Sequence, residues 1–134
     1  MNLENILITG SSGLVGAPLV TKLLNKSNLI VGIDPVINSE CNENYKHISI
    51  PLNSVEDVTN LLEKYDITKI IHTGGISGPM LANENPNIII ENNIFFTMYL
   101  IEAARIYKKI NRFIFCSSIS CLLYTSDAAD DPAS

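Results

Sequence analysis

Short apolar runs alternate with longer amphipathic stretches along the chain. The apolar runs predict buried strands over residues 3–8, 29–33, 46–50, 68–72 and 112–116. Apolar residues at helical spacing predict helices over residues 14–27, from Ser54 to about Tyr65, and from Pro86 to about Tyr107. Ser54, followed three residues later by Asp57, resembles a capping box. Strands that alternate with helices predict an α/β fold with a doubly wound parallel sheet of about five strands.

Composition narrows the class of protein. The chain has 134 residues, about one domain, and is 46% hydrophobic and 17% charged, as globular proteins are. A net charge of −5 and the lack of any Lys/Arg run make nucleic acid and membrane surfaces unexpected partners. Its three cysteines, Cys41, Cys116 and Cys121, have no metal-binding spacing, so we expect reduced thiols and no metal site. With no apolar run of about 18 residues, a cytoplasmic location is expected.

A glycine-rich segment, Thr9 to Gly16, follows the first predicted strand and opens a helix. Its pattern, G-x-x-G-x-x-G, gives a tight turn and a backbone that a pyrophosphate can approach, while the helix N-terminus attracts the anion. We therefore predict a Rossmann-type dinucleotide-binding loop. Its binding residues would be Gly10, Ser12, Gly13, Leu14 and Gly16. The alternative is a Gly/Ser turn that binds nothing.

Asp34 closes the second predicted strand, near the distance of about 20 residues at which an acid accepts hydrogen bonds from the adenosine ribose. A carboxylate there would repel a 2′-phosphate, which favours NAD over NADP. The alternative is that Asp34-Pro35 merely starts a turn.

From Asn5 to Ser120 the chain resembles the extended short-chain dehydrogenases/reductases of the NAD-dependent epimerase/dehydratase type. The shared motifs are T-G-x-x-G-x-x-G at 9–16, a strand ending in His at 72–75, N-x-x-G-T at 93–97, and Ser-Ser at 117–118. This chain departs from the family pattern at three places. Gly74 and Gly75 replace two alanines, Phe96 replaces a glycine, and Pro51 replaces an aspartate that contacts adenine, with Asn53 nearby as a substitute.

The resemblance implies NAD as cofactor, with Thr73, Gly74 and Asn93 among its contacts, and Ser118 as the catalytic serine. His72 is interpreted as a strand-end histidine outside the catalytic set. The implied substrate is a sugar or nucleotide-sugar, acted on by an epimerase, dehydratase or dehydrogenase. The implied assembly is a homodimer that uses the helix over 86–107.

The catalytic Tyr-x-x-x-Lys of the family is expected about 25 residues after the serine, in the next βαβ unit. Tyr124 is followed four residues later by Ala128, and Tyr107 by Asn111, so neither supplies it. Residues 121–130 resemble a translated sequencing adapter. We therefore expect an incomplete NAD-binding Rossmann domain over 1–120 and a non-native or disordered tail over 121–134. The alternative is a genuine, divergent C-terminus.

An incomplete domain has consequences for stability and function. Its last strand would be an apolar, unprotected edge, which predicts marginal stability and weak NAD binding. The fragment would be inactive, whereas the parent would be an enzyme. A non-catalytic, dinucleotide-binding redox-sensing regulator is the alternative.

Overall fold

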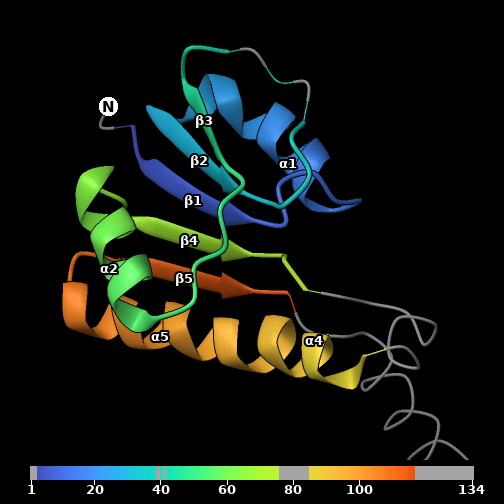
Figure 1. The fold of residues 1–134 in the computed structure, drawn as a ribbon. Coiled ribbons are helices and arrows are strands. Elements are labelled where there is room, and N and C mark those ends of the chain that lie inside the picture. Colours follow the sequence, from blue (N-terminus) through green and yellow to red (C-terminus); the bar gives the residue numbers. More distant parts are fainter. Residues whose placement is uncertain (1–2, 39, 41, 76–84, 117–134) are drawn as a thin grey trace, which may run out of the picture.

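The computed structural model describes residues 3–38, 40, 42–75 and 85–116. They form one five-stranded parallel sheet in the order β3-β2-β1-β4-β5 (Figure 1). The strands are β1 (Asn5–Thr9), β2 (Leu29–Ile33), β3 (Tyr45–Ile48), β4 (Lys69–His72) and β5 (Arg112–Phe115). The predicted α/β doubly wound sheet of five strands is confirmed.

Helical segments connect the strands. They are α1 (Gly16–Leu23) with the 3₁₀ turn η1 (Leu24–Lys26), α2 (Val55–Lys64), α4 (Pro86–Ile90), the π-helical turn η2 (Glu91–Phe95) and α5 (Phe96–Tyr107). In Figure 1, α1 lies on one side of the sheet and α2 and α5 lie on the other. Each face of the sheet therefore has its own helical cover, as right-handed crossovers require.

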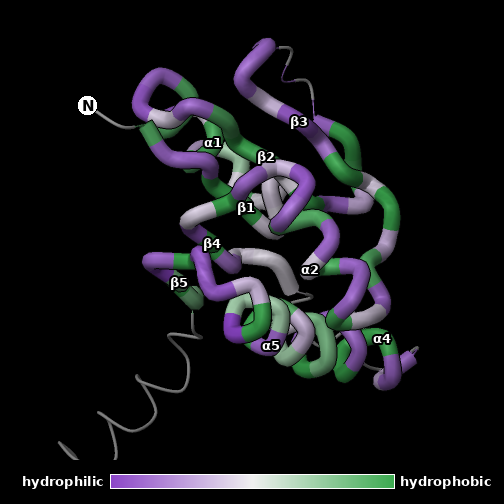
Figure 2. Tube along the Cα trace, turned by 90° about the vertical axis from the view of Figure 1, so that its left-hand side faces the viewer, coloured by the Kyte–Doolittle hydropathy of each residue, from purple (hydrophilic) through white to green (hydrophobic). Residues whose placement is uncertain are grey.

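Two apolar clusters hold these layers together. Leu7, Val31 and Ile70 of the sheet pack with buried residues of α2 and α5. Ile8 and Ile30 face the other way and pack with residues of α1. This alternation follows from the two-residue period of strands. Figure 2 shows that the tube of α5 is largely green or pale, so apolar residues are not confined to the face of this helix that packs on the sheet.

Two of the predicted helices differ in detail. The helix predicted from residue 14 begins at Gly16, because the preceding residues form the turn that leaves β1. The helix predicted as continuous over 86–107 contains the π turn, in which the Phe96 N–H donates to the Glu91 carbonyl five residues back. A π turn adds one residue to a helical turn and so rotates the later part of the helix about its axis.

The strand order reverses beside β1. The connection after β1 runs to the face that carries α1, and the connection after β4 leads to the opposite face. Ligands of open α/β sheets bind at such a switch point, beyond the carboxyl ends of the strands. The topology therefore directs the search for a site to the ends of β1, β2 and β4.

Candidate functional site

A cleft of about 1220 Å³ lies at this switch point. Its floor is formed by the ends of β1, β2 and β4. One wall is the segment 49–53 after β3, and the other is the helical segment from Ile88 to Tyr99. The cleft is large enough for a sizeable organic ligand, since such sites measure roughly 300–1,000 Å³.

Glycine is required at two positions of the loop after β1. Gly10 has φ +68°, and a Cβ there would lie 2.7 Å from the Gly74 Cα. A Cβ on Gly16 would lie 2.0 Å from the Gly10 carbonyl oxygen. These two glycines therefore shape the turn and let it pack against the end of β4, as a G-x-x-G-x-x-G turn requires.

Three residues between them, Gly13, Leu14 and Val15, line the cleft. A Cβ on Gly13 would lie 3.3 Å from the Gly10 carbonyl oxygen, a tight contact but a much milder one than at Gly16. Leu14 is 98% exposed and Val15 is 60% exposed, and both line the cleft. Neither a side-chain cap nor an acidic residue occupies the first turn of α1. The amides at this terminus and the helix dipole therefore fit a ligand anion.

Asp34 lies at the end of β2, where its carboxylate lines the cleft. One carboxylate oxygen accepts from the Ser12 N–H at 3.2 Å and the other from the Val36 N–H at 2.9 Å. These bonds hold the carboxylate in place, and each oxygen has further lone pairs for ligand hydroxyls. Ser12 also donates through its hydroxyl to the Val36 carbonyl, at 2.6 Å. It does not line the cleft, and it ties the glycine loop to Asp34.

A polar group that the sequence analysis missed supports this loop from β3. The hydroxyl of buried Tyr45 lies 3.2 Å from the Ser11 hydroxyl and 2.8 Å from His47 Nδ1. His47 Nε2 lies 2.9 Å from the Asp34 carbonyl oxygen. Room for the Tyr45 hydroxyl depends on Gly32, whose Cβ would lie 2.1 Å from it. The two-residue spacing of Tyr45 and His47 on one strand was the available signal.

His72 ends β4 and is only 1% exposed. Its Nδ1 lies 2.5 Å from the Thr9 hydroxyl, and its Nε2 lies 2.8 Å from the Thr97 hydroxyl. Burial lowers the pKa of His72 to about 4, so its imidazole is neutral at pH 7. Because both ring nitrogens have hydrogen-bond partners within the protein, neither is free to take a proton from a substrate in this arrangement.

Thr73 and Gly74 follow His72 and line the cleft. The Thr73 hydroxyl donates to the Thr9 carbonyl at 2.6 Å, and the Gly74 N–H donates to the Thr9 hydroxyl at 2.9 Å. A Cβ on Gly74 would lie 3.0 Å from both the Gly10 nitrogen and the Thr9 hydroxyl. Glycine therefore lets the end of β4 approach the glycine loop more closely than alanine would.

Asn93 lies in η2, outside the residues that line the cleft. Its side-chain oxygen lies 3.0 Å from where a Cβ on Gly75 would be, so it sits against the backbone that follows β4. The structure thus brings Asn93 beside the predicted Thr73-Gly74 segment.

Part of the cleft has apolar and aromatic walls that the sequence analysis did not assign. Ile50 and Leu52 line it from the segment after β3, and Phe95 and Tyr99 line it from the helical side. Pro51 and Asn53 lie in the first of these walls. The helix period places Phe95 and Tyr99 four residues apart on one face, which was the available signal.

The predicted catalytic Ser118 and the tail over 121–134 lie outside the described residues. The spacing Tyr-x-x-x-Lys does occur once in the sequence, at Tyr65 and Lys69. Tyr65 caps the end of α2, and Lys69 starts β4 and lies 3.9 Å from Glu4. This pair is at the amino ends of the strands, away from the cleft, so it is not the catalytic pair of the family.

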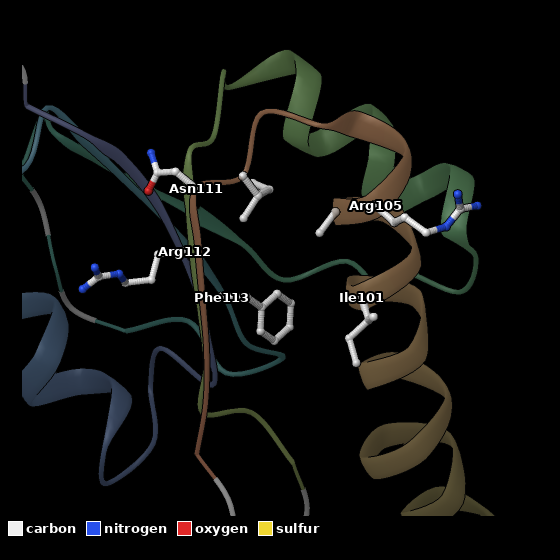
Figure 3. A pocket seen from close by; sticks show the side chains of 7 residues that line it. Ile101, Arg105, Asn111, Arg112 and Phe113 are labelled. Atoms are coloured by element: carbon white, nitrogen blue, oxygen red, sulfur yellow. The ribbon is translucent and has the colours of Figure 1, made fainter.

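A smaller hollow of about 350 Å³ lies between α5 and β5. In Figure 3, Phe113 lies between strand and helix, whereas the Arg105 and Arg112 side chains point away in opposite directions. Arg105 pairs with Glu102 on its own helix. The two cations therefore do not converge on this hollow.

Two further searches cover only the part of the chain that the structure describes. No three His, Cys, Asp or Glu side chains gather there as a metal-ion site would need. None of the described helices combines the length and apolar character of a membrane span.

The sheet order, the glycine turn and the Asp34 carboxylate in one cleft define a dinucleotide-binding protein of the Rossmann class. The model of the NAD dependent epimerase/dehydratase family matches residues 6–133, and the chain belongs to that family. The predicted family membership and the prediction of NAD as cofactor are confirmed.

Individual relatives match this chain over part of their length. An uncharacterized protein, MJ1055, from Methanocaldococcus jannaschii is 31% identical over 135 residues, which cover 90% of this chain and 41% of that protein. A UDP-glucuronate 4-epimerase from Thermodesulfobacterium geofontis is 25% identical over 109 residues, covering 72% and 34%. The crystal structure of a glucuronic acid dehydrogenase from Chromohalobacter salexigens superposes with a TM-score of 0.71 at 29% identity, covering 87% and 41%. The chain thus spans less than half the length of these relatives.

Proposed function

We propose that this chain is the NAD-binding part of an enzyme that oxidises a hydroxyl of a sugar or nucleotide-sugar, as an epimerase, dehydratase or dehydrogenase. The observation that carries the proposal is the cleft in which an uncapped helix N-terminus and a fixed carboxylate lie together. NAD in such a site takes or returns the hydride. The names of the relatives, which include a UDP-glucuronate epimerase and a glucuronic acid dehydrogenase, support a sugar substrate.

The cleft suggests a role for each part of the cofactor. The backbone from Gly13 to Gly16 would hold the pyrophosphate, and Asp34 would accept from the adenosine ribose hydroxyls. The apolar walls at Leu52 and Tyr99 would take the adenine, without the aspartate that the family often has after its third strand. Thr73, Gly74 and Asn93 would serve the nicotinamide half.

Titration of the chain with NAD and NADP, followed by calorimetry, tests this proposal. We expect NAD to bind and NADP to bind at least tenfold more weakly, because the Asp34 carboxylate repels a 2′-phosphate at a cost of about 1.4 kcal/mol or more. The Asp34→Ser variant should reduce that preference. Absence of NAD binding, with the fold shown intact by circular dichroism, would sink the proposal.

Activity of the whole protein depends on residues beyond the described part. We propose Ser118 as the catalytic serine of the parent, and propose that the 134-residue chain alone does not turn over a sugar. Residues 121–134 are proposed to be non-native. Sequencing the source locus beyond the Ser120 codon decides among the alternatives. A continuing frame with Tyr-x-x-x-Lys supports the enzyme, a frame without it supports the redox-sensing regulator, and genomic adapter-like codons contradict truncation.

The proposal also covers the oligomeric state and the cellular location of the parent protein. Ile94, Met98 and Ile101 are each more than half exposed and lie three or four residues apart, on one side of the helical segment. We propose that the parent uses this surface in a homodimer, and that it is cytoplasmic. Light scattering of the parent and of its Met98→Glu variant tests the dimer, because the charge should shift the mass toward that of a monomer.

A further inference from the structure

A continuous chain of hydrogen bonds crosses the carboxyl edge of the sheet beneath the cleft. It joins Thr9 at the end of β1 to His72 at the end of β4, at 2.5 Å, and His72 to Thr97 of α5, at 2.8 Å. Thr97 in turn donates to the Asn93 carbonyl at 2.9 Å. The chain therefore connects three segments that are far apart in the sequence.

The donors fix its direction. The Thr9 hydroxyl accepts from the Gly74 N–H at 2.9 Å, so its own proton can go to His72 Nδ1. Nε2 then carries the imidazole proton and donates it to Thr97, whose proton goes to the Asn93 carbonyl. Each group donates once in this arrangement, and hydrogen bonds in such chains polarise one another.

The surroundings keep the imidazole in this state. The ring of Phe96 stacks on His72 at 5.7 Å between centroids, and the ring of Phe115 at 5.4 Å. Thr9 and His72 are 2% and 1% exposed, so water has little access to their side chains. Burial lowers the pKa of His72, as described above, which disfavours the imidazolium form.

One end of the chain lies in the cleft where the cofactor would bind, and the other end lies against the backbone that follows β4. Thr9, Gly74 and Gly10 line the cleft, and the backbones of Gly10 and Gly74 are in close contact. Asn93 sits against Gly75. Thr97 itself does not line the cleft. A change at Thr97 therefore acts on the cofactor indirectly, through the residues around it.

We propose that His72 is a positioning residue, which joins the glycine loop and the η2–α5 helix through Thr9 and Thr97 and so holds the dinucleotide cleft in its binding shape. This inference rests on the proposed NAD binding. It assigns a structural role at the floor of the cleft to a side chain whose two ring nitrogens both have partners within the protein.

The Thr97→Val variant tests the proposal, because valine has the shape of threonine without the hydroxyl. A buried Nε2–H left without an acceptor should raise the Kd for NAD about tenfold. Thr97→Ser keeps the hydroxyl and should stay within about twofold of the parent chain. Thr59→Val is the matched control, since Thr59 makes the same bond to the carbonyl four residues back, at 2.8 Å to Val55, on α2. It should leave the Kd unchanged.

Nuclear magnetic resonance gives a readout that does not require NAD. In the parent chain at pH 7, the ¹⁵N shifts of the His72 ring should show the Nε2–H tautomer. In Thr97→Val, amide exchange at Gly74 should accelerate while exchange at Ile30 stays unchanged. An Nδ1–H tautomer or a protonated ring in the parent chain overturns the inference, as do equal NAD affinities of the Val and Ser variants. Failure of the parent chain to bind NAD counts against the proposed function, while the tautomer and exchange results still decide the role of His72.

Discussion

Helices α1 and α2 begin in opposite ways. The first turn of α2 contains Glu56 and Asp57, and the Ser54 hydroxyl accepts from the Asp57 N–H at 3.1 Å. The first turn of α1 has no acidic residue and no side-chain cap, and it opens into the cleft. Both termini present amides that need partners.

The contrast separates a helix that completes its own terminus from one whose terminus is available to a ligand. At α2 the protein supplies the negative charge that the helix dipole favours. At α1 the same requirement is met by solvent or by a bound anion, and the exposed Leu14 and Val15 border that position. Leaving the N-terminus of α1 uncapped lowers the stability of the fold by a small part, and it leaves a site at which an anion can bind.

The largest effect is expected from glycine substitutions in the turn before α1. Gly16→Ala places a Cβ 2.0 Å from the Gly10 carbonyl oxygen, and should destabilise the chain by on the order of 3–5 kcal/mol. Gly13→Ala meets that oxygen only at 3.3 Å and should cost less than about 1 kcal/mol. It should nonetheless weaken NAD binding at least tenfold, because its methyl group enters the space that the pyrophosphate needs. Urea unfolding and calorimetry measure the two effects.

Equal losses of stability in the two alanine variants would contradict this division between Gly16, which shapes the turn, and Gly13, which borders the ligand. Gly13→Ser serves as a further check. A larger side chain at that position should weaken NAD binding more than alanine does, with a similar stability.

The His72 ring also contrasts with the uncapped N-terminus of α1, because both ring nitrogens have hydrogen-bond partners within the protein. Its pKa falls from 6.5 to about 4 on burial. The unfolded chain therefore binds a proton that the folded chain does not between these values, and the stability is complete only above about pH 6.5. We expect the free energy of unfolding to fall by about 3 kcal/mol from pH 7 to pH 4 on account of this group.

The His72 ring contacts four uncharged side chains, those of Thr9, Phe96, Thr97 and Phe115. Two acidic residues, Asp34 and Glu91, line the same cleft. Urea unfolding between pH 7 and pH 5 checks the slope before most carboxylates titrate. A His72 ring that titrates near pH 6.5 would contradict the expectation.

The fold and the glycine turn could be predicted from the sequence for physical reasons. Strand and helix periods are local signals, and the pair Ser54 and Asp57 predicted the cap that the structure shows. The glycine pattern likewise encodes a local turn. The bonds of His72 to Thr9 and Thr97 span 63 and 25 residues, so no local pattern could reveal them. The π turn before Phe96 was missed because its residues keep ordinary helical composition.

A negative charge at the uncapped N-terminus of α1 should make this terminus more like that of α2, whose first turn is acidic. Val15→Asp adds a carboxylate at the N-cap position of α1 and should stabilise the chain by about 0.5 kcal/mol without ligand. It should raise the Kd for NAD about tenfold, because the carboxylate repels the pyrophosphate. Val15→Asn has nearly the same shape without the charge and is the control. If both variants bind NAD equally well, charge at this terminus does not govern binding.

The smallest effect is expected at the capped helix. Ser54→Ala removes the acceptor of the Asp57 N–H and should lower the free energy of unfolding by about 1 kcal/mol, as the loss of a side-chain cap does. Ser54→Thr keeps the hydroxyl and should recover most of that loss. Neither change should alter the Kd for NAD measured on folded protein, because this terminus already has its partner within the chain. A Ser54→Ala variant that weakens NAD binding as much as Val15→Asp would mean that the two termini do not divide stability from ligand binding.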